Sequence, residues 1–160
     1  MPRLVLSYVD YLGALYHGYI GRRGRNRRIF ADHNYAKTFL KEIFGVIDVN
    51  YKTYGDLLWE IYRNGTVHLY EPMKLENQGK IITWLVHKYG RIADVPTQLG
   101  NVNLTHLVPY QYGPSEWWQP ISIVCLFRDL VSANGEYANR IISSQSSEAK
   151  FRHGRCSTNS

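Results

Sequence analysis

Three polar residues near the middle of the chain have side chains that can transfer a proton and hold an anionic group. Arg63 and Asn64 are adjacent, and His68 follows four positions later. Histidine is the side chain whose ordinary pKa lies closest to neutrality, so it can accept or donate a proton. Arginine offers a permanently charged fork for phosphate oxygens, and an amide can orient the imidazole or donate to phosphate. Together these abilities suit acid–base chemistry at a phosphate group.

The remaining histidines do not indicate a metal site. They are scattered along the chain, and the pairing of His68 with Glu71 is too weak a pattern for a metal-binding pair. The residues concerned are His17, His33, His87, His106 and His153. We therefore expect chemistry without a metal or any other cofactor.

The local structure around these residues has two interpretations. Asn64-Gly65 favours a tight turn, with strands at Leu58–Arg63 and Thr66–Glu71 forming a hairpin. Alternatively, the apolar residues from Tyr54 to Leu69 keep a helical period straight through the glycine. A helix would place residues four positions apart on one face, and this set comprises Glu60, Asn64 and His68. Only the helical interpretation brings the polar residues together.

Arg63-Asn64 followed by His68 resembles the signature of the HEPN family, in which an arginine with a polar neighbour precedes a histidine by a few residues. This resemblance implies a helical bundle and a metal-independent endoribonuclease of the toxin or defence type. It also implies a homodimer, and a possible antitoxin or nucleotidyltransferase partner. HEPN domains without catalysis are nucleotide-binding or protein-interaction modules, which gives the main alternative. A further alternative is that Arg63 and His68 form a surface pair without catalytic function.

A second feature is an arginine-rich segment. The chain of 160 residues carries a net charge of +6, and residues 21–30 alone contribute five arginines and no acid. These are Arg22, Arg23, Arg25, Arg27 and Arg28. Such a segment predicts contacts with RNA phosphates and salt-sensitive binding, or else a solvated loop. Gly21-Arg22-Arg23-Gly24 also resembles the GxxG loop of a KH domain, which gives a minor alternative as an RNA-binding protein.

Periodicity indicates a mainly α-helical domain over residues 1–142, with about four helices. We expect helices over residues 3–20, from Asp32 or Asn34 to about 49, and from 53 to Pro72. Two strand-like runs, Lys80–Tyr89 and Asn103–Tyr112, predict a small β-hairpin insertion within about 80–112. Pro120 is expected to open the last helix, which would end near Ile142. The Ser-rich residues 143–160 are expected to form a flexible tail.

Other residues have simpler interpretations. Trp117-Trp118 could stack on bases, but such residues more often cap a small core. Cys125 is expected to be a buried small hydrophobe, and the two cysteines do not suggest a disulfide framework, which fits a reducing compartment. No apolar run is long enough to span a membrane, and no signal peptide is evident, so we expect a cytoplasmic protein.

Overall fold

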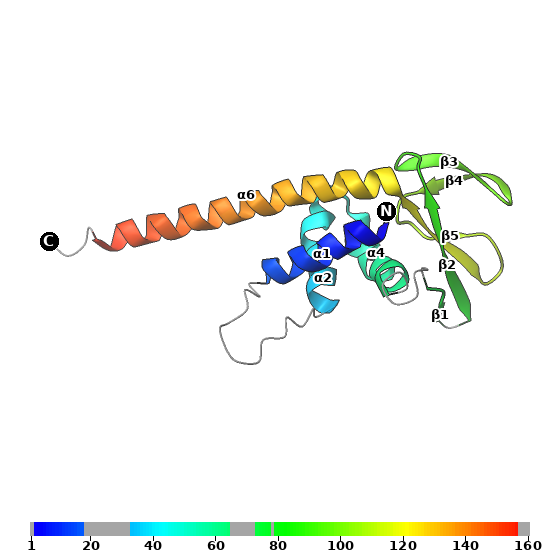
Figure 1. Ribbon diagram of the computed structural model, residues 1–160, viewed down its shortest axis with the longest axis horizontal. Coiled ribbons are helices and arrows are strands. Elements are labelled where there is room, and N and C mark those ends of the chain that lie inside the picture. Colours follow the sequence, from blue (N-terminus) through cyan, green and yellow to red (C-terminus); the bar gives the residue numbers. More distant parts are fainter. Residues whose placement is uncertain (1, 18–32, 65–72, 78, 157–160) are drawn as a thin grey trace.

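The helical half of the protein is built from short segments that follow one another closely in sequence. The computed structural model describes residues 2–17, 33–64, 73–77 and 79–156 (Figure 1). The helices of this half are α1 (Pro2–Tyr16), α2 (His33–Phe39), η1 (Leu40–Phe44), α3 (Gly45–Ile47), α4 (Asn50–Leu58) and η2 (Trp59–Asn64). Both η1 and η2 are π-helical. The three helical regions expected from periodicity are therefore confirmed over these ranges.

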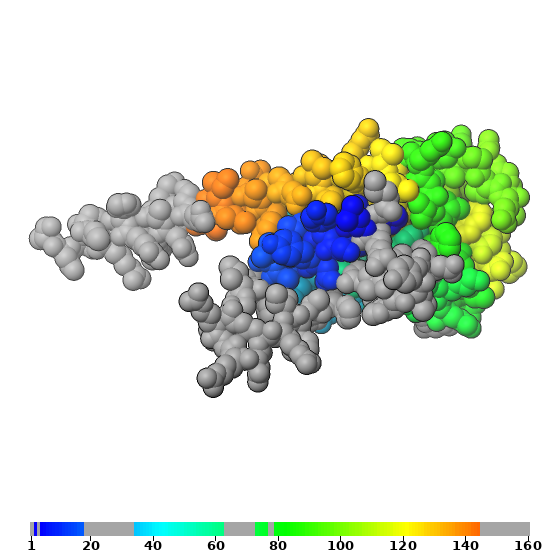
Figure 2. Space-filling view, viewed as in Figure 1, coloured from blue at the N-terminus to red at the C-terminus, as the bar shows by residue number. Residues whose placement is uncertain are grey.

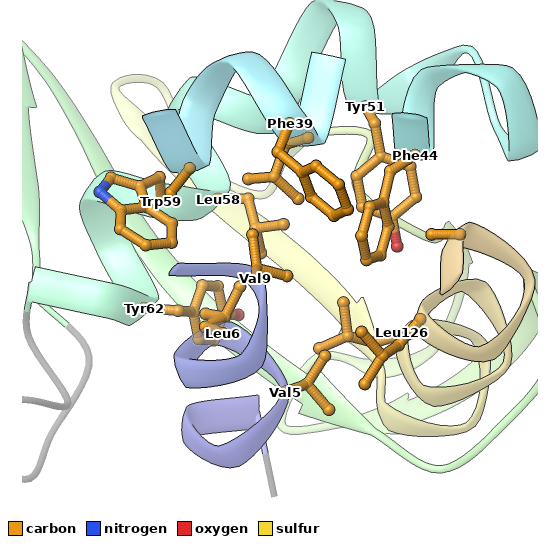
Figure 3. Packing of buried hydrophobic residues seen from close by; sticks show 14 of the residues in the cluster. Val5, Leu6, Val9, Phe39, Phe44, Tyr51, Leu58, Trp59, Tyr62 and Leu126 are labelled. Carbon is orange, nitrogen blue, oxygen red and sulfur yellow. The ribbon is translucent and has the colours of Figure 1, made fainter. Parts of the chain in front are cut away.

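The core of this half lies where α1 packs against the other helices (Figure 3). From α1, Leu6 and Val9 are fully buried, as expected for an amphipathic helix. They pack in one cluster with aromatic side chains that include Phe39 of α2 and Trp59 of η2. At Gly13 a Cβ atom would lie 2.8 Å from the backbone of Tyr35, so the approach of α1 to α2 depends on glycine.

The second half contains two β-sheets. Strands β1 (Leu75–Asn77), β2 (Lys80–His87), β6 (Glu116–Ser122) and β5 (Tyr110–Gln111) form a four-stranded sheet in the order β1-β2-β6-β5. Strands β3 (Ile92–Thr97) and β4 (Gly100–Thr105) form a separate antiparallel hairpin. The long helix α6 (Ile123–Cys156) follows β6 directly. The fold is α+β, so the predicted mainly α, HEPN-like bundle with a small hairpin insertion is wrong.

The physical reason for this error is a long-range strand pairing. β2, expected within residues 80–89, is confirmed, but its partner is β6, in a parallel register that joins Ile81 to Glu116 and His87 to Ser122. Parallel strands need a long connection between them, here made by β3, β4 and β5. A hairpin between Lys80–Tyr89 and Asn103–Tyr112 does not form. The second run divides into β4 and β5 instead.

Leu107 marks the point where that second run bends. Its φ angle is +70°, which is unusual for a residue other than glycine. Its N–H donates to the Pro120 carbonyl at 2.9 Å, and its carbonyl accepts from the buried Gln119 side chain at 2.7 Å. These bonds hold the bend against β6, and the fully buried Leu107 side chain joins the main core.

The last helix also differs from the expectation at both ends. Pro120 lies inside β6, and α6 begins at Ile123 after Ser122, whose hydroxyl accepts from the Cys125 N–H at 3.2 Å. This is a serine N-cap. The helix does not end near Ile142 but continues to Cys156, so much of residues 143–160 is helical. No helix among the described residues is long and apolar enough to cross a membrane.

Candidate nucleic-acid interface

The Arg63-Asn64 pair lies at the end of a helix that is fixed to the sheet. α4 and η2 are consecutive, and Arg63 and Asn64 are the last two residues of η2. The strand predicted by the hairpin alternative at Leu58–Arg63 is therefore wrong. Glu60 and Asn64 both belong to η2, but His68 lies outside the described residues, so the shared face expected for the three residues stays a prediction.

Tyr62 connects this helix to the sheet. Its hydroxyl donates to the Gln119 carbonyl of β6 at 2.8 Å and lies 3.4 Å from the Leu85 carbonyl of β2. The side chain is fully buried, and burial raises the pKa of the phenol well above its ordinary value. The hydroxyl therefore stays protonated and donates a hydrogen bond where β2 and β6 meet. The backbone of the next residue, Arg63, is held close to this junction.

Further contacts fix η2 on its other sides. Glu60 forms an ion pair with Lys37 of α2, so its carboxylate is engaged in a structural contact. The Met73 N–H donates to the Ile61 carbonyl at 2.8 Å, which joins the chain before β1 to the same helix. His68 is midway in sequence between Arg63 and Met73. The described residues before the His68 position therefore belong to η2, and Met73, which follows it, is hydrogen-bonded to η2.

The sheet face that receives Tyr62 also carries exposed aromatic side chains. Alternation along β2 places Trp84 on the same face as Ile82, which packs on the core, and Trp84 is 41% exposed. Trp117 of β6 pairs with Ile82 and is partly exposed on that face. The Lys80 ammonium lies 5.7 Å from the centre of the Trp117 ring. Indole faces beside a cation are suited to stacking on unpaired bases.

The two adjacent tryptophans, singled out from the sequence as one pair, separate onto opposite faces of the sheet. Trp118 stacks on Tyr112, with ring centres 4.3 Å apart, and lies 6.2 Å from the Tyr110 ring. It therefore belongs to an aromatic stack on the outer face. Cys125 is 5% exposed, as predicted for a buried small hydrophobe.

The remaining residues of the predicted site fall outside this description. The structure places Arg63 and Asn64 by their backbone only. His68 lies outside the described residues, as do Gly21, Gly24 and the five arginines Arg22, Arg23, Arg25, Arg27 and Arg28. No group of three histidine, cysteine or acidic residues within the described ranges is arranged to hold a metal ion.

A buried polar network was not predicted from the sequence. The Tyr51 hydroxyl donates to Asp129 of α6 at 2.9 Å and lies 3.3 Å from His106 Nε2. The Ser122 N–H donates to His106 Nδ1 at 3.0 Å, so the neutral imidazole carries its proton on Nε2. Arg91 bridges Asp129, at 2.6 Å, and Asp48. These residues are far apart in sequence, and no short motif indicates that they meet.

This network joins parts of the fold, and its centre at His106 and Asp129 is closed to solvent, whereas the Arg91 side chain is 38% exposed. His106 is fully buried, and Asp129 is 2% exposed. Burial, and then the nearby charge of Arg91, lower the pKa of His106 to about 3. Neighbouring His87 is 6% exposed, its ring nitrogens have no hydrogen-bond partner among the described residues, and burial lowers its pKa. The His106 imidazole is neutral, enclosed and already hydrogen-bonded, so it serves stability and has no access to substrate.

Comparison with known proteins finds no matching family model, no similar curated protein and no similar solved structure. Any assignment of function therefore depends on the chemistry of the residues themselves.

Proposed function

We propose that the protein is a metal-independent endoribonuclease that acts through Arg63, Asn64 and His68. The observation that supports it is the attachment of η2 to the sheet through Tyr62. This contact sets the Arg63-Asn64 backbone beside a sheet face with exposed indoles and a lysine. The proposal depends on these residues and not on a HEPN-like fold, and we place the activity in the cytoplasm.

The proposed reaction is attack by the ribose 2′-hydroxyl on the adjacent phosphate. His68 accepts the proton of the 2′-hydroxyl as the new bond from the 2′-oxygen to phosphorus forms. Arg63 stabilises the negative charge that develops on the phosphate oxygens, and Asn64 orients the imidazole or donates to the phosphate. The bond from phosphorus to the 5′-oxygen breaks, and that oxygen takes a proton from a water molecule, to which the protonated His68 in turn gives up the proton that it accepted. The products are a 2′,3′-cyclic phosphate and a free 5′-hydroxyl.

Trp84 and Trp117 would hold the substrate beside these groups. Stacking of a base on an aromatic side chain contributes about 1–3 kcal/mol and requires an unpaired base, so the substrate would be a single-stranded region. Lys80, next to Trp117, adds a positive charge for the RNA backbone. The five arginines of residues 21–30 would supply further phosphate contacts.

The test uses the purified chain and an end-labelled single-stranded RNA in excess chelator. We expect cleavage with a 2′,3′-cyclic phosphate at the new end. We also expect Trp84→Ala to raise KM about tenfold or more with little change in kcat. The matched control is Trp118→Ala, because Trp118 lies on the opposite face.

The main alternative is a binding module without catalysis, which the exposed Trp84 and its neighbours would also suit. It predicts RNA binding that Trp84→Ala weakens, with no cleavage product after long incubation. Cleavage that requires a divalent metal would contradict the proposed mechanism. A chain that neither binds nor cleaves RNA would exclude both functions.

A further inference from the structure

An exposed apolar stripe runs along α6, on the side away from the buried network. Its residues repeat with heptad spacing, at positions separated alternately by three and four residues. They are Val124, Phe127, Val131, Asn134, Ala138 and Ile141. The apolar side chains are well exposed, with Phe127 at 55% and Val131 at 58%. A heptad pattern on an uncovered helix is typical of contact with another helix.

Helix α1 extends this apolar surface. It lies beside the first turns of α6, and the two helices face the same side of the molecule (Figure 2). On α1, Leu4, Tyr8 and Tyr11 lie on one flank and are each more than half exposed. Between the helices is a pocket of about 290 Å³, lined mainly by Pro2, Val5, Ile123, Val124 and Phe127. Projecting side chains and an apolar hollow therefore lie next to each other on one face.

The stripe continues where α6 extends beyond the rest of the protein. Tyr137 still packs against the core, and Arg140 donates to the Glu42 carbonyl at 3.2 Å. Beyond this point α6 projects away from the other helices (Figure 1). Ile141 is 40% exposed there. A helix outside a protein body has little stability without packing, so the projecting part of α6 would gain from a second helix.

We propose that this face binds a second copy of the chain, with α6 of one copy packed along α6 of the other. The exposed heptad residues would form the seam, and one polar residue within such a seam, Asn134, would fix its register. Side chains such as Phe127 and Tyr8 of one copy would fill the pocket between α1 and α6 of the other. This inference is independent of the proposed ribonuclease activity.

The exposed apolar area of this face is large enough for the centre of an interface with a second copy of the chain. A buried aromatic side chain covers about 150–250 Å², so each half-exposed one here offers roughly 100 Å². The exposed apolar area of this face is then on the order of 500 Å² per chain. It comes from Tyr8, Tyr11, Phe127, Leu4, Val124 and Val131. A standard interface buries about 800 Å² per partner, in which a polar rim surrounds such an apolar centre. The face is broader than a small molecule would need.

The experiment is sedimentation velocity of the full chain from about 1 to 100 µM. We expect a concentration-dependent dimer that Val131→Glu converts to a monomer, with at least a tenfold weaker association. Ser132→Glu is the matched control, because Ser132 is exposed on another side of α6 and gains the same charge. Far-UV circular dichroism of both variants should match that of the parent chain.

Two results would overturn the proposal. One is a parent chain that stays monomeric at the highest concentration, since the face would then serve another partner. The other is a dimer that Val131→Glu and Ser132→Glu weaken equally, since the contact would then lie elsewhere. Ribonuclease activity enters neither result, so the two proposals fail separately.

Discussion

At the scale of single residues, two buried histidines determine how the fold responds to acid. Burial lowers the pKa of His106 to about 3, from an ordinary value of 6.5, and also lowers that of His87. The His106 side chain stays neutral in the folded protein under mildly acidic conditions, whereas it takes up a proton in the unfolded chain. The unfolded state therefore binds more protons below about pH 6.5, and stability falls as the pH falls.

The first prediction follows from this difference. Between pH 7 and pH 5 the free energy of unfolding should decrease, with a slope from His106 that approaches about 1.4 kcal/mol per pH unit, and the lowered pKa of His87 acts in the same direction. Urea denaturation at a series of pH values measures it. His106→Gln should flatten the slope, because the substitution removes the buried imidazole. Equal slopes for the parent and His106→Gln would contradict the assignment.

Individual residues differed in how well the sequence indicated their place. Cys125 was predicted correctly as a buried residue because a thiol inside an apolar run has few other roles. The contact of Tyr51 with His106 and Asp129 could not be predicted, because it joins three elements whose arrangement depends on the whole fold. The link from Tyr62 to β6 was missed for the same reason.

At the scale of elements, two helical glycines have opposite environments. A Cβ atom at Gly13 would meet the backbone of Tyr35 at 2.8 Å, whereas a Cβ atom at Gly135 would meet no atom within 4 Å apart from the neighbouring backbone of its own helix. Gly13→Ala should force α1 away from α2 and destabilise the fold by roughly 1–3 kcal/mol. Gly135→Ala should stabilise the fold by up to about 1 kcal/mol, because alanine is the better helix former.

Thermal or urea unfolding of the two variants tests this pair directly. The same substitution in the two helices controls for intrinsic helix propensity. If both variants changed stability in the same direction, the close approach of α1 and α2 would not be a determinant of stability.

The elements were predictable where their signals were local. The helical spacing of Leu4, Tyr8 and Tyr11 indicated α1, although the buried face of that helix is formed by Leu6 and Val9 instead. Strand β2 was evident from its β-branched and aromatic residues. Pro120 misled the prediction because proline suits the first turn of a helix, but here it lies within a strand. The parallel pairing of β2 with β6 has no local signal, and this single omission changed the fold class.

At the scale of the whole molecule, the surplus positive charge is concentrated in one segment of the sequence, and the exposed apolar residues considered above belong to α1 and α6. Of the net charge of +6, residues 21–30 supply five positive charges, while the face of α1 and α6 is apolar. If the arginines contact RNA phosphates, each contact should add about 0.7 to the slope of log affinity against log salt for single-stranded RNA. Replacement of all five arginines by serine should flatten that slope.

The matched control replaces the same five arginines by lysine, which keeps the charge and should keep most of the slope. Fluorescence anisotropy at several salt concentrations measures both variants. A slope that the serine variant leaves unchanged would remove residues 21–30 from the RNA site, whether or not cleavage occurs.

The proposed proton transfer by His68 during RNA cleavage is tested most directly by the single-turnover rate of cleavage. Single-turnover cleavage of a single-stranded RNA in excess chelator is compared for the parent chain, His68→Ala and His153→Ala. The control residue His153 belongs to the distant end of α6 (Figure 1). We predict a loss of at least about 10²-fold for His68→Ala, with an unchanged circular dichroism spectrum and full activity of His153→Ala. Cleavage by His68→Ala at the parent rate would contradict the mechanism.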